Sequence, residues 1–351
     1  MSNDKLSVGI LGATGMVGQE FISRLSSHPW FQVSWLGASE RSAGKRFEDA
    51  VPWRLPQARP DFIRAMEVNV CKPGSAPEII FSGLDSSVAG KVEADFAKEG
   101  HIVVSNARNF RMDADVPLLV PEINPEHLDL ISVQKQKRNW SGCIVTNPNC
   151  STIVLTMAIA PLCQFGLQAV NVTTLQAVSG AGHPGVSSFD IVGNIIPQIP
   201  GEEEKIELET KKILGKMSTG NIEEHGVTVS AHTTRVGVLN GHTEMVSVSL
   251  KDKPNPSEVI DAFRGFKGRP QNANLPTAPM SAVEYLLEPD RPQPNLDVNR
   301  GDGMTVTVGR LRKCPVLGYK FVVLGHNTVR GAAGAAILNA ELMKADGFFE
   351  K

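Results

Sequence analysis

The chain of 351 residues lacks the features typical of secreted, membrane-spanning and nucleic-acid-binding proteins. Its five cysteines are odd in number and form no C-x-x-C pair, which argues against a disulfide framework and a structural zinc site. The formal net charge is only -2 without a long block of one sign, so we expect no nucleic-acid or membrane surface. No apolar run approaches the roughly 20 residues that span a bilayer, and the polar residues 1–5 do not resemble a signal peptide. We therefore expect a cytoplasmic protein with small-molecule partners and no metal.

An apolar run, a glycine-rich turn and a helical pattern follow one another near the start of the chain. Residues 6–11 are apolar, Gly12, Gly15 and Gly18 form a G-x-x-G-x-x-G motif, and Phe21 begins the buried side of the helix. This order lets the backbone approach a pyrophosphate at the amino end of the helix. The residues predicted to bind a dinucleotide here are Gly12, Thr14, Gly15, Met16 and Val17.

The end of the next predicted strand, residues 32–36, indicates which dinucleotide binds. An NAD enzyme usually offers an acidic residue to the ribose hydroxyls at this point. Here Ser39, Arg41 and Ser42 are suited to holding a 2'-phosphate, and Glu40 is the one acidic residue that would favour NAD instead. The sequence favours NADP, with a solvated charged loop as the alternative.

Two further apolar runs, residues 78–82 and 101–105, predict buried parallel strands. Ligands bind beyond the carboxyl ends of such strands, so Ser82 becomes a candidate for cofactor binding. Arg111, in the loop after the second run, is a candidate anion clamp, and the alternative is a surface arginine.

One cysteine stands out by its position. Asn147, Pro148 and Asn149 form a turn signal directly before Cys150, and the apolar run at residues 153–160 predicts a helix. Cys150 would then lie at the amino end of that helix, where the helix dipole favours a thiolate over a thiol. Because a thiolate is a nucleophile, we predict attack by sulfur on an acyl carbon followed by hydride transfer to or from a nicotinamide.

The second half of the chain alternates apolar and polar residues. The alternating runs cover residues 170–176, 227–231, 243–250 and 304–311. This pattern predicts a mostly antiparallel sheet in a second domain, and a partner subunit is a plausible cover for its broad face. Arg235 and His242 flank the turn signal Asn240-Gly241, which can bring them together. Arginine grips carboxylates and histidine transfers protons near neutral pH.

Two helix ends supply the remaining candidates. Glu202 and Lys205 are three residues apart on a predicted helix, share a face, and match a substrate with one positive and one negative group; a solvated acidic helix start is the alternative. Asn327 precedes a helix rich in small residues that could return to the first domain and place Asn327 near the nicotinamide amide.

We therefore predict an α/β protein of two domains. Residues 1–149 would form a Rossmann-like NADP-binding domain completed by a C-terminal helix at residues 328–351. Residues 150–327 would form an α+β catalytic and dimerisation domain.

With these residues assembled, the chain resembles the aspartate-semialdehyde dehydrogenases over nearly its whole length. The segments that carry the resemblance are residues 12–18, 105–124, 147–152, 176–182, 235–242 and 327–334. The Asn-Pro-Asn-Cys-Ser-Thr motif and the absence of long insertions resemble the fungal and archaeal branch. Ala107 and Asn109 depart from the family pattern without removing Arg111.

The resemblance implies a reaction and a role for each candidate. L-aspartate 4-semialdehyde, phosphate and NADP would give L-4-aspartyl phosphate and NADPH reversibly, on the pathway to threonine, methionine and, in some organisms, lysine. Cys150 would be the nucleophile, His242 the acid/base and Gln176 the residue that orients the acyl group. The implied substrate contacts are Arg235 for the carboxylate, Glu202 for the ammonium group, and Arg111, Lys205 and Asn149 for phosphate. Ser179 and Gly180 would join the cofactor site, and the protein would be a homodimer or homotetramer.

Three alternatives stay open at this point. A malonyl-CoA reductase would keep the cysteine chemistry but accept a thioester, and retention of Arg235 and Glu202 disfavours it. An N-acetyl-glutamyl-phosphate reductase would not need Glu202, because its substrate amine is acylated. The third alternative is an NADP-binding sensor without turnover, against which the intact Cys150 and His242 argue.

Overall fold

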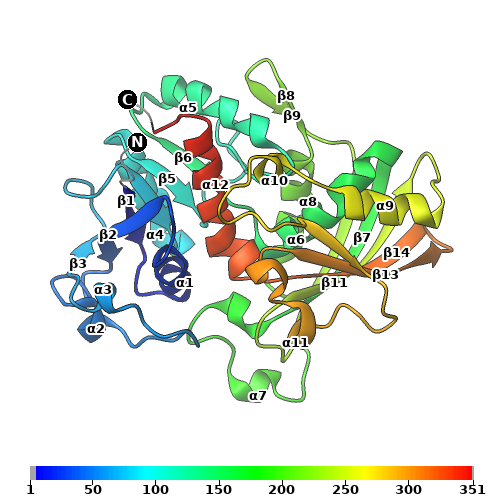
Figure 1. Cartoon of the computed structure of the whole chain (residues 1–351), viewed down its shortest axis with the longest axis horizontal. Helices are drawn as coiled ribbons and strands as arrows, with labels where there is room; N and C mark the ends of the chain where they lie inside the picture. The colour runs from blue at the N-terminus through cyan, green and yellow to red at the C-terminus, as the bar shows by residue number, and fades with distance from the viewer. Residues whose placement is uncertain (1–4, 350–351) are drawn as a thin grey trace.

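The computed structural model describes residues 5–349, which form two large sheets with helices packed against each (Figure 1). The predicted absence of a signal peptide at residues 1–5 concerns a segment that, except for Lys5, lies outside the described residues. All pairings in the first sheet are parallel. Its strands, in spatial order, are β3 (Val68–Val70), β2 (Phe31–Ala38), β1 (Leu6–Leu11), β4 (Ile79–Ser82), β5 (Ile102–Ser105) and β6 (Cys143–Thr146).

Helices cover both faces of this sheet, as its continuous apolar strands require. Side chains of α1 (Met16–Leu25) pack on one face, and side chains of α4 (Ser86–Lys98) pack on the other. The strand, glycine turn and helix predicted at the start of the chain are confirmed, as is the Rossmann-like fold of this part. The other helices of this part are α2 (Phe47–Ala50), α3 (Asp61–Arg64) and α5 (Leu130–Arg138).

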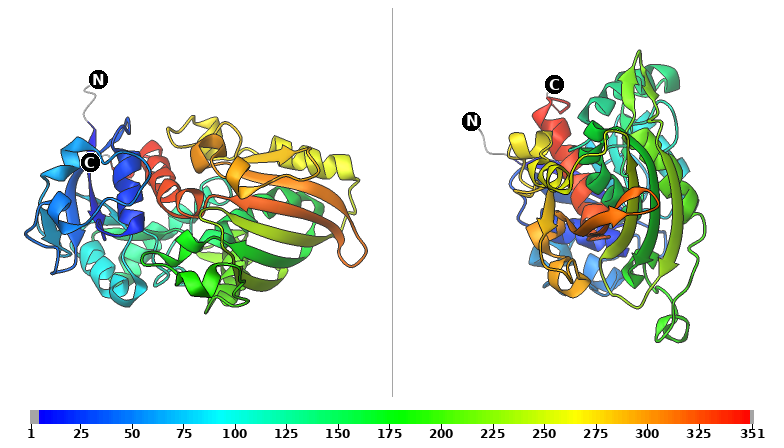
Figure 2. Two further views of the ribbon diagram at one scale, coloured as in Figure 1. Left: turned by 90° about the horizontal axis from the view of Figure 1, so that it is seen from below. Right: turned by 90° about the vertical axis from the view of Figure 1, so that its right-hand side faces the viewer.

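The last helix returns to the first sheet. After a π-helical turn over Val329–Ala333, α12 (Gly334–Ala345) packs Ala336, Ile337 and Ala340 into the same core as α1. Small side chains allow this close approach. Figure 2 shows α12, in red, between the two sheets. The helix is shorter than the predicted segment 328–351, because the chain leaves it at Asp346 and turns at Gly347; residues 350 and 351 lie outside the described residues.

The second sheet is mixed. Three of its five pairings are antiparallel, which confirms the predicted character, and the pairings at its two edges are parallel. Alternation cannot distinguish a parallel edge from an antiparallel one, since both have a period of two residues. Its strands, in spatial order, are β10 (Thr228–Arg235), β7 (Leu167–Gln176), β11 (His242–Leu250), β14 (Gly318–Gly325), β13 (Val306–Cys314) and β12 (Val283–Leu286).

Three helices cover one face of the second sheet: α6 (Cys150–Ile159), α8 (Glu202–Ile213) and α9 (Pro256–Gly265). The opposite face is only partly exposed: Met245 of β11 is 45% exposed, whereas Val322, its pair on β14, is 7% exposed. An arm that carries α7 (Ser188–Ile191) projects from this domain, and its Phe189 is 97% exposed. The remaining α-helices are α10 (Arg269–Asn272) and α11 (Pro294–Asp297), and the remaining strands form the hairpin of β8 (Lys216–Ser218) and β9 (Asn221–Glu223). Short 3-10 helices cover Pro125–Asp129, Ala160–Phe165, Val178–Ala181 and Arg300–Gly303.

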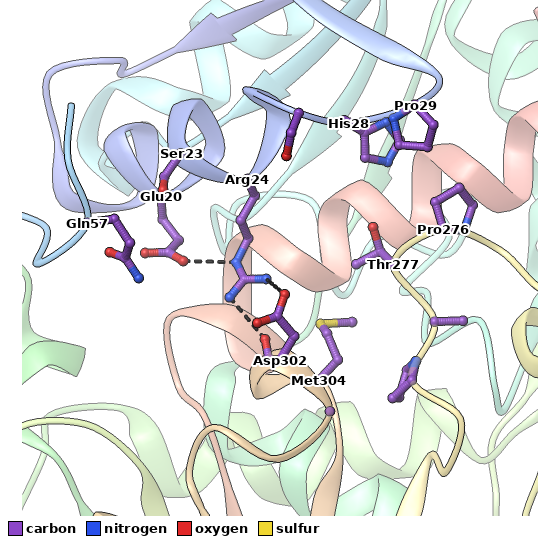
Figure 3. A pocket seen from close by; sticks show the side chains of 14 residues that line it. Glu20, Ser23, Arg24, His28, Pro29, Gln57, Pro276, Thr277, Asp302 and Met304 are labelled. Atoms are coloured by element: carbon purple, nitrogen blue, oxygen red, sulfur yellow. Dashed lines mark hydrogen bonds and ion pairs between the residues drawn. The ribbon is translucent and has the colours of Figure 1, made fainter. Parts of the chain in front are cut away.

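A pocket of about 510 Å³ lies where α1 meets residues 276–304 (Figure 3). Arg24 of α1 donates to a carboxylate oxygen of Glu20 at 2.9 Å and to the carbonyl oxygen of Asp302 at 3.1 Å. The candidate site residues lie elsewhere, so we interpret the contacts of Arg24 as structural contacts between α1 and the second half of the chain.

Within residues 5–349, no helix has the length and apolar character needed to cross a membrane.

Candidate functional site

Most of the candidate residues lie at one end of the strands of the second sheet, where β7 and β10 finish and β11 begins. Gln176 ends β7 and pairs in register with Arg235, the last residue of the parallel strand β10. Strand β11 runs in the opposite direction, so its first residue, His242, lies at the same end. Cys150 begins α6 and Glu202 begins α8 on the covered face. A cavity of about 420 Å³ opens here, and its lining includes Arg111, Asn149, Cys150, Gln176, Ser179, Gly180, Glu202, Arg235 and Asn327.

The predicted helix after the asparagine turn is confirmed. Asn149 is its N-cap, and its side-chain oxygen accepts hydrogen bonds from the backbone N–H groups of Ser151 and Thr152 at 3.0 and 3.2 Å. Such caps satisfy donors that the helix itself leaves unpaired. The cap therefore fixes where α6 begins and places Cys150 at its first position.

Cys150 and His242 are in contact. The sulfur lies 3.1 Å from Nε2 of the imidazole, and the backbone N–H of Ala177 donates to Nδ1 at 3.1 Å. Because Nδ1 accepts, the neutral ring carries its proton on Nε2 and directs it toward the sulfur. Burial lowers the pKa of His242 to about 3, with Arg235 and His326 contributing. The ring is therefore neutral at physiological pH.

The expectation that the helix end favours a thiolate is wrong for the chain as it stands. Burial, and then the negative charge of Glu202, raise the pKa of Cys150 to about 12. Arg111, Arg235 and Lys205 lower this pKa but do not outweigh burial. Loss of hydration is therefore the largest contribution to this pKa.

This pKa predicts how Cys150 reacts with iodoacetamide. Below its pKa the thiolate fraction grows about tenfold per pH unit, so the alkylation rate should rise in that proportion from pH 7 to pH 10. Glu202→Gln should raise the rate at each pH, because it removes a charge that raises the pKa. Mass spectrometry of the peptide that contains Cys150 separates it from the other cysteines. A plateau below pH 8 would contradict the assignment.

Arg235 and His242 converge as the turn signal predicts. Gly241 has a φ of +97°, and a Cβ atom placed on Gly180 would lie 2.9 Å from Nη1 of Arg235 and 3.1 Å from Cε1 of His242. A side chain at position 180 would therefore meet both residues. Arg235 also donates to the carbonyl oxygen of Ala177 at 2.8 Å, and burial lowers its pKa from the ordinary value.

Glu202 joins several of the candidates. Its carboxylate accepts from Nζ of Lys205 at 2.5 Å, from Nδ2 of Asn149 at 2.7 Å and from Nε2 of Gln176 at 3.4 Å. Burial alone would raise its pKa, but the charge and hydrogen bond of Lys205 and the two amide donors leave the pKa below its ordinary value. Glu202 is therefore a buried carboxylate that faces the cavity.

Arg111 is 7% exposed and lines the same cavity. Its Nη1 donates to Glu209 at 3.0 Å and its Nη2 donates to the carbonyl oxygen of Asn106 at 2.8 Å. Its Nε is buried and has no hydrogen-bond partner among residues 5–349. A buried N–H of this kind is costly unless it meets an acceptor, so it suits a bound anion.

Sequence reasoning missed Glu209 and Lys212, which are buried on α8. A signal for Glu209 was available. Positions 206, 209 and 213 share one face of a helix, and Ile206 and Ile213 are core residues, so a carboxylate stands within an apolar stripe.

A neighbouring cavity, of about 510 Å³, lies at the amino end of α1 and shares lining residues with the cavity beside Cys150. Its lining includes Thr14, Gly15, Met16, Val17, Arg41, Ser42, Gly180 and Gly182. Gly12 has a φ of +74°, and a Cβ on Gly18 would lie 2.3 Å from the carbonyl oxygen of Gly12, so the turn requires both glycines. No side chain caps α1, which leaves its first N–H groups available to a phosphate. These residues fit a dinucleotide.

Three predicted cofactor residues have other surroundings. Ser39 is exposed, and its carbonyl oxygen accepts from the N–H of Ser42. The hydroxyl of Ser82 is fully buried and donates to Glu93 at 2.6 Å. Asn327 lines the first cavity and joins Gly241 to Ser179 through hydrogen bonds of 2.8 and 2.7 Å. The cofactor contacts of these three residues, like those of the other cofactor candidates, stay predictions. In the part of the chain that the structure describes, no three His, Cys, Asp or Glu side chains are grouped to hold a metal ion.

Comparisons with known proteins agree with this geometry. Residues 7–131 match the family model "Semialdehyde dehydrogenase, NAD binding domain", and residues 159–330 match "Semialdehyde dehydrogenase, dimerisation domain". The chain is 51% identical to the aspartate-semialdehyde dehydrogenase of Archaeoglobus fulgidus over 97% of this chain and 98% of that protein.

Two solved structures are also similar. The aspartate-semialdehyde dehydrogenase of Candida albicans with NADP has a TM-score of 0.90 and 43% identity, and the match covers 99% of this chain and 100% of that one. Aspartate-semialdehyde dehydrogenase II of Vibrio cholerae complexed with ASA has a TM-score of 0.77 and 28% identity over 98% and 99% of the two chains. The predicted resemblance is confirmed, with archaeal and fungal proteins among the relatives, and the chain belongs to the aspartate-semialdehyde dehydrogenase family.

Proposed function

We propose that this chain is an NADP-dependent enzyme that converts L-aspartate 4-semialdehyde and phosphate reversibly into L-4-aspartyl phosphate. The observation that carries the proposal is the 3.1 Å contact between Sγ of Cys150 and Nε2 of His242, beside a cavity lined by Arg111, Glu202 and Arg235. Membership of the family, the NADP named in the Candida albicans structure and the ASA named in the Vibrio cholerae structure support it. The reaction is a step of amino-acid biosynthesis.

The sulfur of Cys150 forms and breaks the covalent bond to substrate. In the oxidative direction it attacks the aldehyde carbon to give a thiohemiacetal, whose oxidation leaves a thioester; phosphate then attacks the thioester carbon and releases the sulfur. This sequence replaces one difficult displacement by two easier steps. NADP, when bound, supplies the hydride acceptor, and the residues from Thr14 to Val17 with Arg41 and Ser42 would hold it.

His242 and Gln176 would act on the oxygen of the substrate's reacting carbonyl group. Nε2 of His242 faces the sulfur and lies 3.5 Å from Nε2 of Gln176. The neutral imidazole donates a hydrogen bond from its Nε2–H to the substrate oxygen as negative charge develops on that oxygen in either direction. In the oxidative direction the Sγ–H proton of Cys150 passes to the aldehyde oxygen as the thiohemiacetal forms, and this proton leaves for solvent when the hydride departs. The Gln176 amide orients the acyl group.

The charges of the cavity match the charges of the substrate. Glu202 would bind the ammonium group, Arg235 the carboxylate, and Arg111 and Lys205 the phosphate, with Asn149 beside them. Glu202 is also the charge that raises the pKa of Cys150. A bound ammonium group would offset this charge and so lower the pKa of Cys150 when that part of the substrate is in place.

Arg235→Ala should raise the KM for the semialdehyde by about tenfold to 100-fold, because a charge-assisted hydrogen-bonding partner of the carboxylate is lost. Steady-state kinetics at saturating phosphate measure this effect. The Kd for NADP should change by less than about twofold. Arg235→Lys is the matched control and should give an intermediate KM, since it keeps the charge but not the planar fork. An unchanged KM in the alanine variant would remove Arg235 from the carboxylate site.

The function itself is tested by following NADP reduction with L-aspartate 4-semialdehyde. We expect reduction that requires phosphate. Coenzyme A in place of phosphate should give none, and reduction that depends on coenzyme A would favour the acyl-CoA alternative. Binding of NADP without turnover under any condition would favour the sensor.

We also propose that the chain divides at residue 149 into a cofactor domain, completed by the last helix, and a catalytic domain. A homodimer would cover the partly exposed face of the second sheet around Met245, with the arm of Phe189 reaching the partner, and the name of the matching dimerisation domain supports this. A tetramer and a cytoplasmic location stay predictions.

A further inference from the structure

Helix α8 carries a buried carboxylate that the reaction does not use directly. Glu209 is 2% exposed and lies on the face of α8 that also buries Ile206 and Ile213. A buried carboxylate is unfavourable unless it is paired and hydrogen-bonded. Its partners therefore indicate why it is there.

The two carboxylate oxygens of Glu209 hold two different parts of the site. Oε1 forms an ion pair with Nη1 of Arg111 at 3.0 Å, and Oε2 accepts the backbone N–H of Asn149 at 2.6 Å. Arg111 lies in the loop after β5, whereas Asn149 caps the helix that begins with Cys150. One side chain thus ties the candidate phosphate arginine to the residue next to the nucleophile.

The contacts of Glu209 also fix the plane of the Arg111 guanidinium. Glu209 holds Nη1 and the carbonyl oxygen of Asn106 holds Nη2, and within the described part of the chain the remaining nitrogen, Nε, is buried without a partner. A guanidinium has a rigid planar fork, so fixing two of its nitrogens determines the direction of the third. Arg111 is therefore oriented before an anion arrives.

The next turn of α8 holds the same loop. Nζ of Lys212 donates to the carbonyl oxygens of Arg111, Asp113 and Val116 at 2.7, 2.8 and 2.8 Å, and the side chain is 4% exposed. Helix α8 thus fixes the backbone at position 111 through Lys212 and the side chain through Glu209.

We propose that Glu209 is a positioning residue. It holds the guanidinium of Arg111 and the backbone N–H of Asn149 at fixed positions relative to each other, so that phosphate is bound where it attacks the thioester carbon. This inference rests on the proposed function and deepens it. It assigns to Glu209 no contact with substrate. Its effect is transmitted through Arg111 and Asn149.

Glu209→Gln tests the role with little change in shape. Both partners of Glu209 are N–H donors, so they need two acceptor oxygens, and glutamine offers one oxygen and one amide that also donates. The KM for phosphate should rise about tenfold or more, as expected when a charge-assisted hydrogen bond is lost. The KM for the semialdehyde and the Kd for NADP should stay within about twofold. Glu204→Gln, at an exposed position of the same helix, is the matched control and should leave all three unchanged.

Two further variants make the test decisive. Glu209→Asp keeps the charge but cannot reach both partners, so its KM for phosphate should lie between those of the wild type and Glu209→Gln, and it replaces the glutamine variant if that variant fails to fold. In an Arg111→Ala background, Glu209→Gln should raise the KM for phosphate by a smaller factor than in the wild type, because one of the two partners of Glu209 is already gone. Additive effects, an unchanged KM for phosphate, or an equal rise in every KM would each overturn the proposal. Failure of the wild type to require phosphate would instead refute the proposed function.

Discussion

Replacing Cys150 with serine is expected to lower kcat/KM for phosphate-dependent NADP reduction by a factor on the order of 10⁴ or more. The serine hydroxyl has nearly the size of the thiol but ionises far less readily, so the covalent intermediate hardly forms. Cys150 is also the residue whose sulfur lies 3.1 Å from the imidazole of His242. Activity is measured as absorbance of NADPH over a range of semialdehyde concentrations.

A matched control for this variant is Cys163→Ser. Cys163 follows α6, and its sulfur contacts only the carbonyl oxygen of Ile159 at 3.9 Å among the hydrogen-bond contacts of the described residues. We expect this control to keep activity within about twofold, because its change is far from the cavity. Substantial turnover by Cys150→Ser would refute the covalent route, provided that the protein is free of wild-type enzyme.

The second large effect is expected for His242. His242→Ala should reduce kcat by about 10²- to 10³-fold, the usual contribution of one preorganised hydrogen-bond donor to a developing oxyanion. His242→Gln should lose less, since an amide N–H can still donate toward the substrate oxygen. Because burial lowers the pKa of His242 to about 3, the ring stays neutral from pH 5 to pH 9, and the wild-type pH profile should show no inflection near the ordinary histidine value. Full activity of the alanine variant, or such an inflection lost in that variant, would contradict this role.

The parts of the fold that depend on neighbouring residues in the sequence were predictable. The glycine spacing of residues 12–18 predicts the turn before α1. Gly12 has a positive φ, and the backbone at Gly18 lies so close to the carbonyl oxygen of Gly12 that no side chain fits there. The motif around Asn149 likewise predicts the start of α6, because an N-cap acts on the N–H groups of its own helix. Alternation predicted β7, β10, β11 and β13 of the second sheet, since side chains alternate between its faces, but β14 was not predicted.

Properties that depend on tertiary burial were not predictable in the same way. The pKa of Cys150 is set mainly by loss of hydration in the folded chain, so the local rule for helix ends gave the wrong direction. The partners of Glu209 are 98 and 60 residues away in sequence, and no local pattern indicates such pairings. The short strands β3 and β12 also escaped prediction, since strands of three or four residues show little periodicity.

The central claim is that a thioester forms on Cys150, and trapping that adduct tests it most directly. The protein is mixed with NADP and L-aspartate 4-semialdehyde without phosphate, quenched in acid, digested and examined by mass spectrometry. We predict one aspartyl group on the peptide that contains Cys150, absent when phosphate is added before the quench. An acyl group on another residue, or rapid turnover with Cys150 unmodified at every time of quenching, would contradict the account.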